Sequence, residues 1–489
     1  MRKISLLLVT LFLPLASSAH VNSPDVYFDG QAGPYHLLVT IKPPAVIPGI
    51  AQIQIRSAGN DVEEIKILPL RMVGTAAKLA PTADVAQRSA SDPELFTGQL
   101  WIMARGSWKV EVEAQGKQGA GQLAVPLPAV SSNSARMQAP LGALLSVLGL
   151  ALVLGLVGII GAATRDADLR PGDQPPAEKK KRGYFRMGVT ALLLIVILVF
   201  ANRWWGAEAS ANARLNYKQP HVQTELTGNL LRLRLENPNL PERNRFGMES
   251  PDRLVLNDLV PDHGHIMHLF LVRMPDMKSF WHLHPVQTGE AQFAVNLPNM
   301  PVGRYQIYAD IVHHSGFPET QVGQIDLSAI GGEPLSGDDS GASDLPAAAG
   351  VAQLSGGYRM VWLRDQQPIK AGEPVWFRFR VEDKDGKPAR DMENYMGMAG
   401  HAVFLSTDGA IFAHVHPAGS PPMAALSIAQ GGNATMSGMS GMAAMDHGPM
   451  DGEVSFPYGF PKAGDYRIYV QIKRGGHVET GNFVAQVQQ

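Results

Sequence analysis

Short runs of alternating apolar and polar residues fill three stretches of the chain, and two long apolar stretches interrupt them. Between residues 20 and 130 the runs include HLLVTIKP, VEEIKILPL and SWKVEVEAQ, separated by glycine, proline and Asn-Asp. Regularly spaced alternation with a period of two, without helical periodicity, is typical of an antiparallel β-sandwich. Similar runs occupy 217–328 and 351–487. We therefore expect all-β domains, immunoglobulin- or cupredoxin-like, on either side of the apolar stretches.

The two apolar stretches predict a transmembrane hairpin. Residues 141–163 are long enough to cross about 30 Å of hydrocarbon as a helix. Residues 186–205 form the second span, with aromatic residues near both ends that suit the membrane interface. The connection, 164–185, is rich in lysine and arginine, so the positive-inside rule places it in the cytoplasm. Residues 1–19 have the pattern of a signal peptide, which independently exports the N-terminal β-sandwich of residues 20–130.

The second and third β-rich stretches are copies of one another. MGMAGHAVFLSTDGAIFAHVHP (396–417) aligns with HGHIMHLFLVRMPDMKSFWHLHP (263–285), and GDYRIYVQIKRGGHVET matches GRYQIYADIVHHSGFPET downstream. The segment between the copies, 329–350, is small, acidic and rich in proline and glycine, which predicts a flexible linker. We expect two copies of one sandwich, with His268 over His401 and His282 and His284 over His414 and His416.

Histidine is concentrated in these copies. Neutral imidazole is the commonest protein metal ligand, and it suits copper and zinc. Residues two apart in a strand point to the same face, so His282 and His284 project together, and His268 is expected beside them. The candidate ligands are His263, His265, His268, His282, His284, His313 and His314 in the first copy, with His401, His414 and His416 in the second. Met396 and Met398 replace His263 and His265 in the second copy, where they either soften the site towards Cu(I) or only pack in the core.

Composition limits the partners and the metal ligands that the chain can have. The net charge of −2 gives no reason to expect a nucleic-acid partner, and the lack of cysteine excludes disulfides and thiolate metal sites. An insertion in the second copy, 418–452, is rich in Gly, Ser and Ala, and carries Met436, Met439, Met442, Met445, His447 and Met450. Such spacing predicts a mobile loop whose thioethers bind Cu(I); the alternative is a generic low-complexity loop.

The predicted mature N-terminus adds a further candidate. Cleavage after residue 19 would leave His20 first, so its α-amino nitrogen and ring Nδ1 could chelate one Cu(II) ion. The alternative is that His20 is an arbitrary first residue of an exported protein. The choice between the two stays open at this point.

The motifs bear a family resemblance. The duplicated HxMH…HLHP and GMAGH…HVHP segments resemble the YtkA-like domains of exported bacterial proteins, which are related in shape to CopC-type copper carriers. The MxxMxxM…MDHGPM loop is similar to the methionine-rich segments of periplasmic copper-resistance proteins. The resemblance implies β-sandwiches in the periplasm, anchored in the inner membrane of a bacterium as a multi-pass protein.

Two functions from different classes fit these features. The first is a membrane-anchored periplasmic protein that binds metal, with copper as the first cofactor and zinc as the second, for buffering, delivery or resistance. Its partners would be the lipid bilayer and a copper-transfer protein. The second is a non-catalytic interaction or assembly module of a membrane complex, with structural histidines. An enzyme ranks last because the sequence shows no acid–base or nucleophile constellation.

Overall fold

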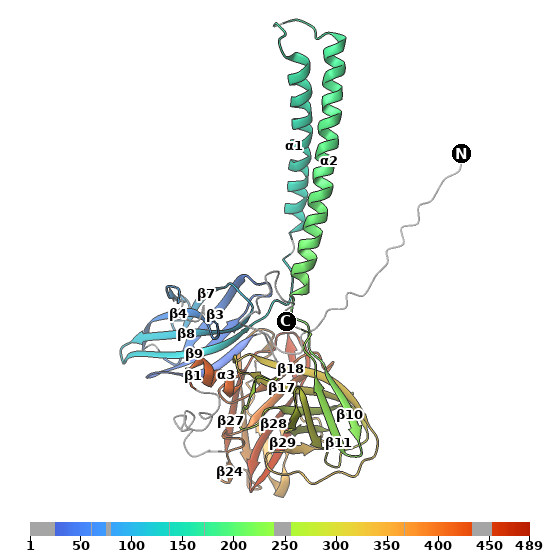
Figure 1. Cartoon of the computed structure of the whole chain (residues 1–489). Helices are drawn as coiled ribbons and strands as arrows, with labels where there is room; N and C mark the ends of the chain where they lie inside the picture. Colours follow the sequence, from blue (N-terminus) through green and yellow to red (C-terminus); the bar gives the residue numbers. More distant parts are fainter. Residues whose placement is uncertain are drawn as a thin grey trace, which may run out of the picture. The chain divides into compact units, whose positions relative to one another are not determined.

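The computed structural model describes residues 25–59, 61–74, 80–135, 137–170, 172–238, 256–365, 367–432 and 452–489. The signal peptide, His20 and the six Met and His candidates of the insertion lie outside them. The described chain is mostly β-sheet, as the sequence predicts, and two of its three helices are the long apolar ones expected from the sequence (Figure 1). It divides into two compact units, one formed by 131–217 and one by the residues before and after that segment.

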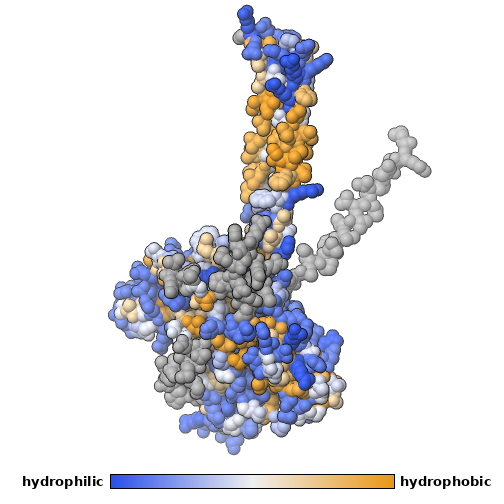
Figure 2. All heavy atoms as spheres, in the orientation of Figure 1, coloured by the Kyte–Doolittle hydropathy of each residue, from blue (hydrophilic) through white to orange (hydrophobic). Residues whose placement is uncertain are grey.

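The smaller unit is a pair of long helices, α1 (Ala139–Asp166) and α2 (Ala177–Arg214). Both are long and apolar enough to cross a membrane. Their leucine, isoleucine and valine side chains point outward, and Figure 2 shows this apolar band along the middle of the pair. Each helix runs beyond its predicted span. The basic residues 179–182, expected in the connecting loop, instead form the first turns of α2, because lysine and arginine are good helix formers.

The larger unit begins with nine strands in two sheets, ordered β1-β2-β3-β7-β6 and β5-β4-β8-β9. One apolar core draws residues from both sheets. Alternate residues of β8, for example, are buried, as the period-two pattern predicts. The strands are β1 (Val26–Ala32), β2 (Tyr35–Lys42), β3 (Gly49–Ser57), β4 (Val62–Arg71), β5 (Asp84–Val85), β6 (Gln87–Arg88), β7 (Leu95–Ile102), β8 (Gly106–Gly116) and β9 (Gly119–Ala129).

The first copy also has two sheets, ordered β10-β11-β16-β15 and β12-β17-β13-β14-β19, with β18 paired to β17. The segment 329–350 is not a free linker, because its strand β19 pairs with β14. The strands are β10 (Val222–Thr227), β11 (Leu230–Leu235), β12 (Leu259–Val260), β13 (His268–Met274), β14 (Phe280–Leu283), β15 (Val286–Gly289), β16 (Gln292–Asn296), β17 (Gly303–His313), β18 (Pro318–Leu327) and β19 (Ser340–Ala342).

The second copy repeats this plan, with sheets ordered β20-β21-β23-β27 and β22-β29-β28-β25-β26, and with β24 paired to β28. A short helix, α3 (Met423–Ala429), opens the insertion with most of its residues buried, so this part is not the mobile loop that the sequence predicts. The strands are β20 (Val351–Gln353), β21 (Arg359–Trp362), β22 (Ile369–Lys370), β23 (Val375–Glu382), β24 (Met392–Glu393), β25 (His401–Ser406), β26 (Phe412–Val415), β27 (Glu453–Tyr458), β28 (Gly464–Arg474) and β29 (His477–Gln488).

The two copies pack face to face through equivalent residues. The ring of Phe280 stacks on that of Tyr469 at 4.3 Å between centroids, and Tyr308 stacks on Phe412 at the same distance. The two tyrosine hydroxyls each donate a hydrogen bond to a backbone carbonyl of the other copy, at 3.0 and 2.7 Å. A buried apolar cluster from both copies surrounds these pairs. The interface therefore has a local two-fold pseudo-symmetry, as expected when duplicated surfaces pair with each other.

The N-terminal strands contact the second copy beside α3. Asp29 N–H donates to the Ala418 carbonyl at 2.8 Å, and Ser420 N–H donates to the Tyr27 carbonyl at 2.9 Å. Met398 of the second copy lies within the apolar core of the N-terminal sheets. The two backbone hydrogen bonds fix the chain immediately after the HVHP motif.

Candidate metal centre

Eight histidines from the two copies form one continuous cluster of neighbouring rings at this interface. Centroids of neighbouring rings in the cluster are 3.8–6.0 Å apart. The members are His263, His265, His268, His282, His284, His401, His414 and His416. The sequence predicts a separate ligand set within each copy. The structure instead merges both sets, because the two copies face each other.

A tight turn brings the first of these histidines to the interface. Asp262 and His265 exchange both backbone hydrogen bonds, at 2.8 and 3.0 Å, across His263 and Gly264. Both central residues have positive φ, 51° and 86°, as a type I′ turn requires. A non-glycine residue in this region costs on the order of 1–3 kcal/mol, so the fold holds His263 in place against a local preference.

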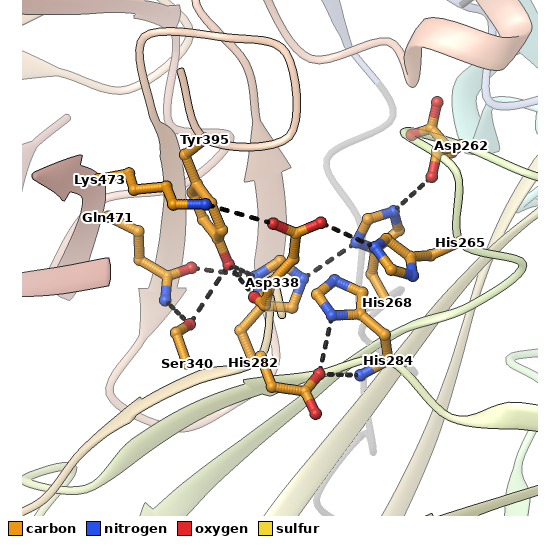
Figure 3. Close-up of polar contacts among 11 residues, drawn as sticks. Asp262, His265, His268, His282, His284, Asp338, Ser340, Tyr395, Gln471 and Lys473 are labelled. Atoms are coloured by element: carbon orange, nitrogen blue, oxygen red, sulfur yellow. Dashed lines mark hydrogen bonds and ion pairs between the residues drawn. The ribbon is translucent and has the colours of Figure 1, made fainter. Parts of the chain in front are cut away.

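Three histidines of the first copy form the better-organised group, His268, His282 and His284, whose ligand atoms lie within 4.8 Å of one another (Figure 3). Nδ1 of His268 is 3.0 Å from Nε2 of His282. The other nitrogen of His268 lies 3.1 Å from the Asp262 carbonyl, and Nδ1 of His284 lies 2.9 Å from the Asp339 carboxylate. Both acceptors lack protons, so each of these nitrogens carries a hydrogen and the opposite nitrogen presents a lone pair.

A chain of hydrogen bonds assigns the tautomer of His282. The Tyr395 hydroxyl donates to the Asp338 carbonyl at 2.8 Å, so its oxygen accepts from Ser340, 3.3 Å away. Ser340 then accepts from the Gln471 amide nitrogen, which leaves the amide oxygen 3.0 Å from Nδ1 of His282. Nδ1 of His282 is therefore the protonated nitrogen. Its Nε2 lone pair points at the lone pair of the neighbouring ring.

The second group draws on both copies. His401, the first residue of β25, and His416, just after β26, lie with His263 of the first copy, and their ligand atoms fall within 4.8 Å of one another. Both ring nitrogens of His401 are buried and have no hydrogen-bond partner among the residues that the structure describes, and the buried ring of His416 meets only the backbone at Gly419 and Pro421. His414 lies beside both groups, with ring centroids 5.4 Å from His268 and 4.6 Å from His416.

The six imidazoles of these two groups are neutral at pH 7. Burial, followed by neighbouring imidazoles, lowers the pKa of His268, His282, His401 and His416 well below its ordinary value. Burial also lowers the pKa of His284, against the opposing effect of its aspartate partner. Neutral imidazole is the form that binds metal, so these rings need not release protons first.

The remaining predicted residues lie elsewhere. Burial would lower the pKa of His313, but hydrogen bonds to Asp258 and Glu319 outweigh it and raise the pKa to about 9. His313 is therefore a buried imidazolium between two carboxylates, and His314 is exposed. Met396 occupies the position equivalent to His263, in a turn with the same positive φ of 51°. Met398 packs in the N-terminal core, as the packing alternative for the methionines anticipates.

Sequence reasoning missed the residues that hold the ligand rings. Asp338, Asp339 and Ser340 come from the segment predicted as a linker, and Gln471 comes from the other copy. A signal for Gln471 exists in the repeat, because it aligns with Asp310 as an inward-facing polar residue on an apolar strand. Asp310 contacts Nδ1 of His414 at 3.5 Å, the counterpart of the contact between Gln471 and His282.

Comparisons with known proteins add little to this geometry. A family model described as a domain of unknown function, DUF8832, matches residues 352–489, which is the second copy. No curated protein matches the chain.

Several solved structures show weak likeness. An engineered protein is 12% identical over 19% of this chain and 20% of its own, with a TM-score of 0.16. A tetra-tandem repeat from the extending region of a large adhesion protein is 7% identical over 90% of this chain and 71% of its own, with a TM-score of 0.16. Native α-2-macroglobulin of E. coli is 9% identical over 96% and 22%, with a TM-score of 0.20. Likenesses of this size carry no argument.

Proposed function

We propose that the chain is a membrane-anchored metal-binding protein that holds copper, or zinc as the second candidate, at His268, His282 and His284. The observation that carries the proposal is the pair of ring nitrogens 3.0 Å apart in the first group. The hydrogen-bond network directs a lone pair from each ring into this gap, and both rings are neutral at pH 7. Two facing lone pairs repel unless a proton or a cation lies between them.

The gap suits a metal ion, and burial disfavours the additional proton that would turn one ring into an imidazolium. Two nitrogens at the usual Zn–N length in tetrahedral geometry would lie about 3.3 Å apart, close to the observed spacing. Nε2 of His284 is buried without a hydrogen-bond partner among the described residues, and it supplies a third ligand. Each ring donates its other N–H to a carbonyl, an amide oxygen or a carboxylate, which is the usual outer-shell arrangement of metal-binding histidines.

The proposed setting combines this group with the two apolar helices. With the basic start of α2 in the cytoplasm, the β-domains and the metal centre would face the periplasm, where the YtkA-like and CopC-like resemblance also places them. Imidazole suits both Cu(II) and Zn(II), and the predicted thioether loop would favour Cu(I). The role that follows is copper buffering, delivery or resistance, with a copper-transfer protein as partner.

Metal titration of the full chain in detergent tests the proposal. Cu(I), Cu(II) and Zn(II) are titrated against chromophoric chelators, for the wild type and for His282→Gln. We expect His282→Gln to weaken Zn(II) binding at the first group by at least about 100-fold, because one of three ligands is lost. His36→Gln, a half-exposed histidine of the N-terminal sheets, is the matched control and should bind as the wild type does. Equal affinity in both variants would favour the assembly module with structural histidines.

A further inference from the structure

We infer that a second metal ion binds between the copies, at His263, His401 and His416, so that the interface holds a two-ion centre. The inference rests on the function proposed above and extends it to a second group. The first ion uses ligands of one copy alone, whereas the second uses ligands of both.

Unpartnered nitrogens carry this inference. His401 and His416 are each 1% exposed, yet neither ring nitrogen of His401 has a hydrogen-bond partner in the described part of the chain, and His416 meets only the backbone at Gly419 and Pro421. Nε2 of His263 is likewise buried and without a partner there. Burying a polar group without a hydrogen-bond partner is unfavourable, so native folds rarely collect several such groups at one point. Three imidazoles whose ligand atoms lie within 4.8 Å of one another would be satisfied together by one cation.

The turn at His263 explains how the site crosses the interface. Its ring lies 5.0 Å from those of His401 and His416, and its other nitrogen donates to the Met396 backbone. Met396 occupies the equivalent turn of the second copy, so the two turns meet at the interface. The two copies do not contribute the same residue across the interface, because the second copy has Met396 where the first has His263. The first copy thus donates a ligand to the second group, and the second copy donates the supporting amide of Gln471 to the first.

His414 is a further buried imidazole between the two groups. Its Nε2 is buried and has no hydrogen-bond partner within the described ranges, and its Nδ1 faces the Asp310 carboxylate at 3.5 Å. Its ring lies 5.4 Å from both His268 and His401. His414 therefore lies beside both groups with a carboxylate orienting its ring, although it belongs to neither set of ligand atoms within 4.8 Å.

Counting bound Zn(II) in the full chain tests the inference, since thioethers are poor Zn(II) ligands and the methionine loop should not contribute. We expect His401→Gln and His263→Gln each to bind one ion fewer than the wild type. His284→Gln should also lose one ion, from the first group. His477→Gln, an exposed residue at the start of β29, is the control and should lose none. An ion retained in the first group shows that a variant has folded.

Each other outcome is decisive. If His401→Gln and His263→Gln bind as many ions as the wild type while His284→Gln binds one fewer, the second site is refuted and the proposed function stands. If the wild type binds neither Zn(II) nor Cu(II), both fail. If a variant misfolds and loses every ion, electron paramagnetic resonance of the wild type loaded with Cu(II) tests the inference instead. Two neighbouring ions give a spin-coupled spectrum. A spectrum of isolated spins at full loading overturns the inference.

Discussion

Replacing Gln471 by methionine tests whether the second copy controls the metal affinity of the first. The amide oxygen lies 3.0 Å from Nδ1 of His282, and both residues are fully or almost fully buried. Methionine keeps the approximate size of glutamine but removes the acceptor. The N–H of the His282 ring then has no hydrogen bond to Gln471 that fixes the orientation of the ring. Such outer-shell changes typically cost 10–100-fold in metal affinity, or about 1.4–2.7 kcal/mol. We expect Zn(II) at the first group to bind more weakly by that factor.

The assay is a chelator competition at pH 7 on the full chain in detergent. Gln471→Glu restores an acceptor of similar size and should bind Zn(II) at least about ten times more tightly than Gln471→Met. Gln486→Met changes an exposed residue of the same sheet and serves as control. In the metal-free protein, the unpaired His282 N–H should also lower the free energy of unfolding by about 1–3 kcal/mol. An affinity within twofold of the wild type for Gln471→Met would refute the tautomer assignment.

Three further outcomes are expected. The pKa of His313 is raised from 6.5 to about 9 in the folded protein, so its contribution of about 3 kcal/mol to stability is present below pH 6.5 and is lost as the pH rises to 9. The melting temperature of His313→Gln should therefore lie below that of the wild type at pH 6 and approach it at pH 9.5. A difference that stays constant with pH would contradict this. Phe412→Ala should lower the free energy of unfolding in denaturant by about 3–5 kcal/mol, and Tyr308→Phe by about 1 kcal/mol. Equal losses for the two variants would show that ring stacking does not dominate the stability of this interface. Reporter fusions at Pro175 and after Asn212 should report opposite compartments, and the same compartment for both would overturn the hairpin.

Much of the fold could be predicted because it depends on local periodicity. Alternation located the strands, apolar length located α1 and α2, and the internal repeat gave the equivalence of His268 and His401. The strand registers bear this out, since these residues pair with Asp310 and Gln471 at equivalent positions of β17 and β28. The period of two also correctly brought His282 and His284 into one group.

The rest depends on how the two copies pack, which no local pattern encodes. His263 aligns with Met396, and that alignment suggested two independent sites. Only the packing of the two copies shows that the ring of His263 lies beside His401 and His416. The linker prediction for 329–350 failed for a similar reason. Its small acidic residues favour a flexible segment in isolation, but pairing of β19 with β14 and the contacts of Asp339 to His284 hold it in place.

The most direct test of the metal centre is X-ray absorption at the copper or zinc edge of the loaded full chain. At one ion per chain, we expect a first shell of nitrogen at about 2.0 Å, with the outer scattering of at least three imidazole rings. His282→Gln should lose one of those rings. A first shell of sulfur, or of oxygen without imidazole scattering, would contradict the assignment of the metal to His268, His282 and His284.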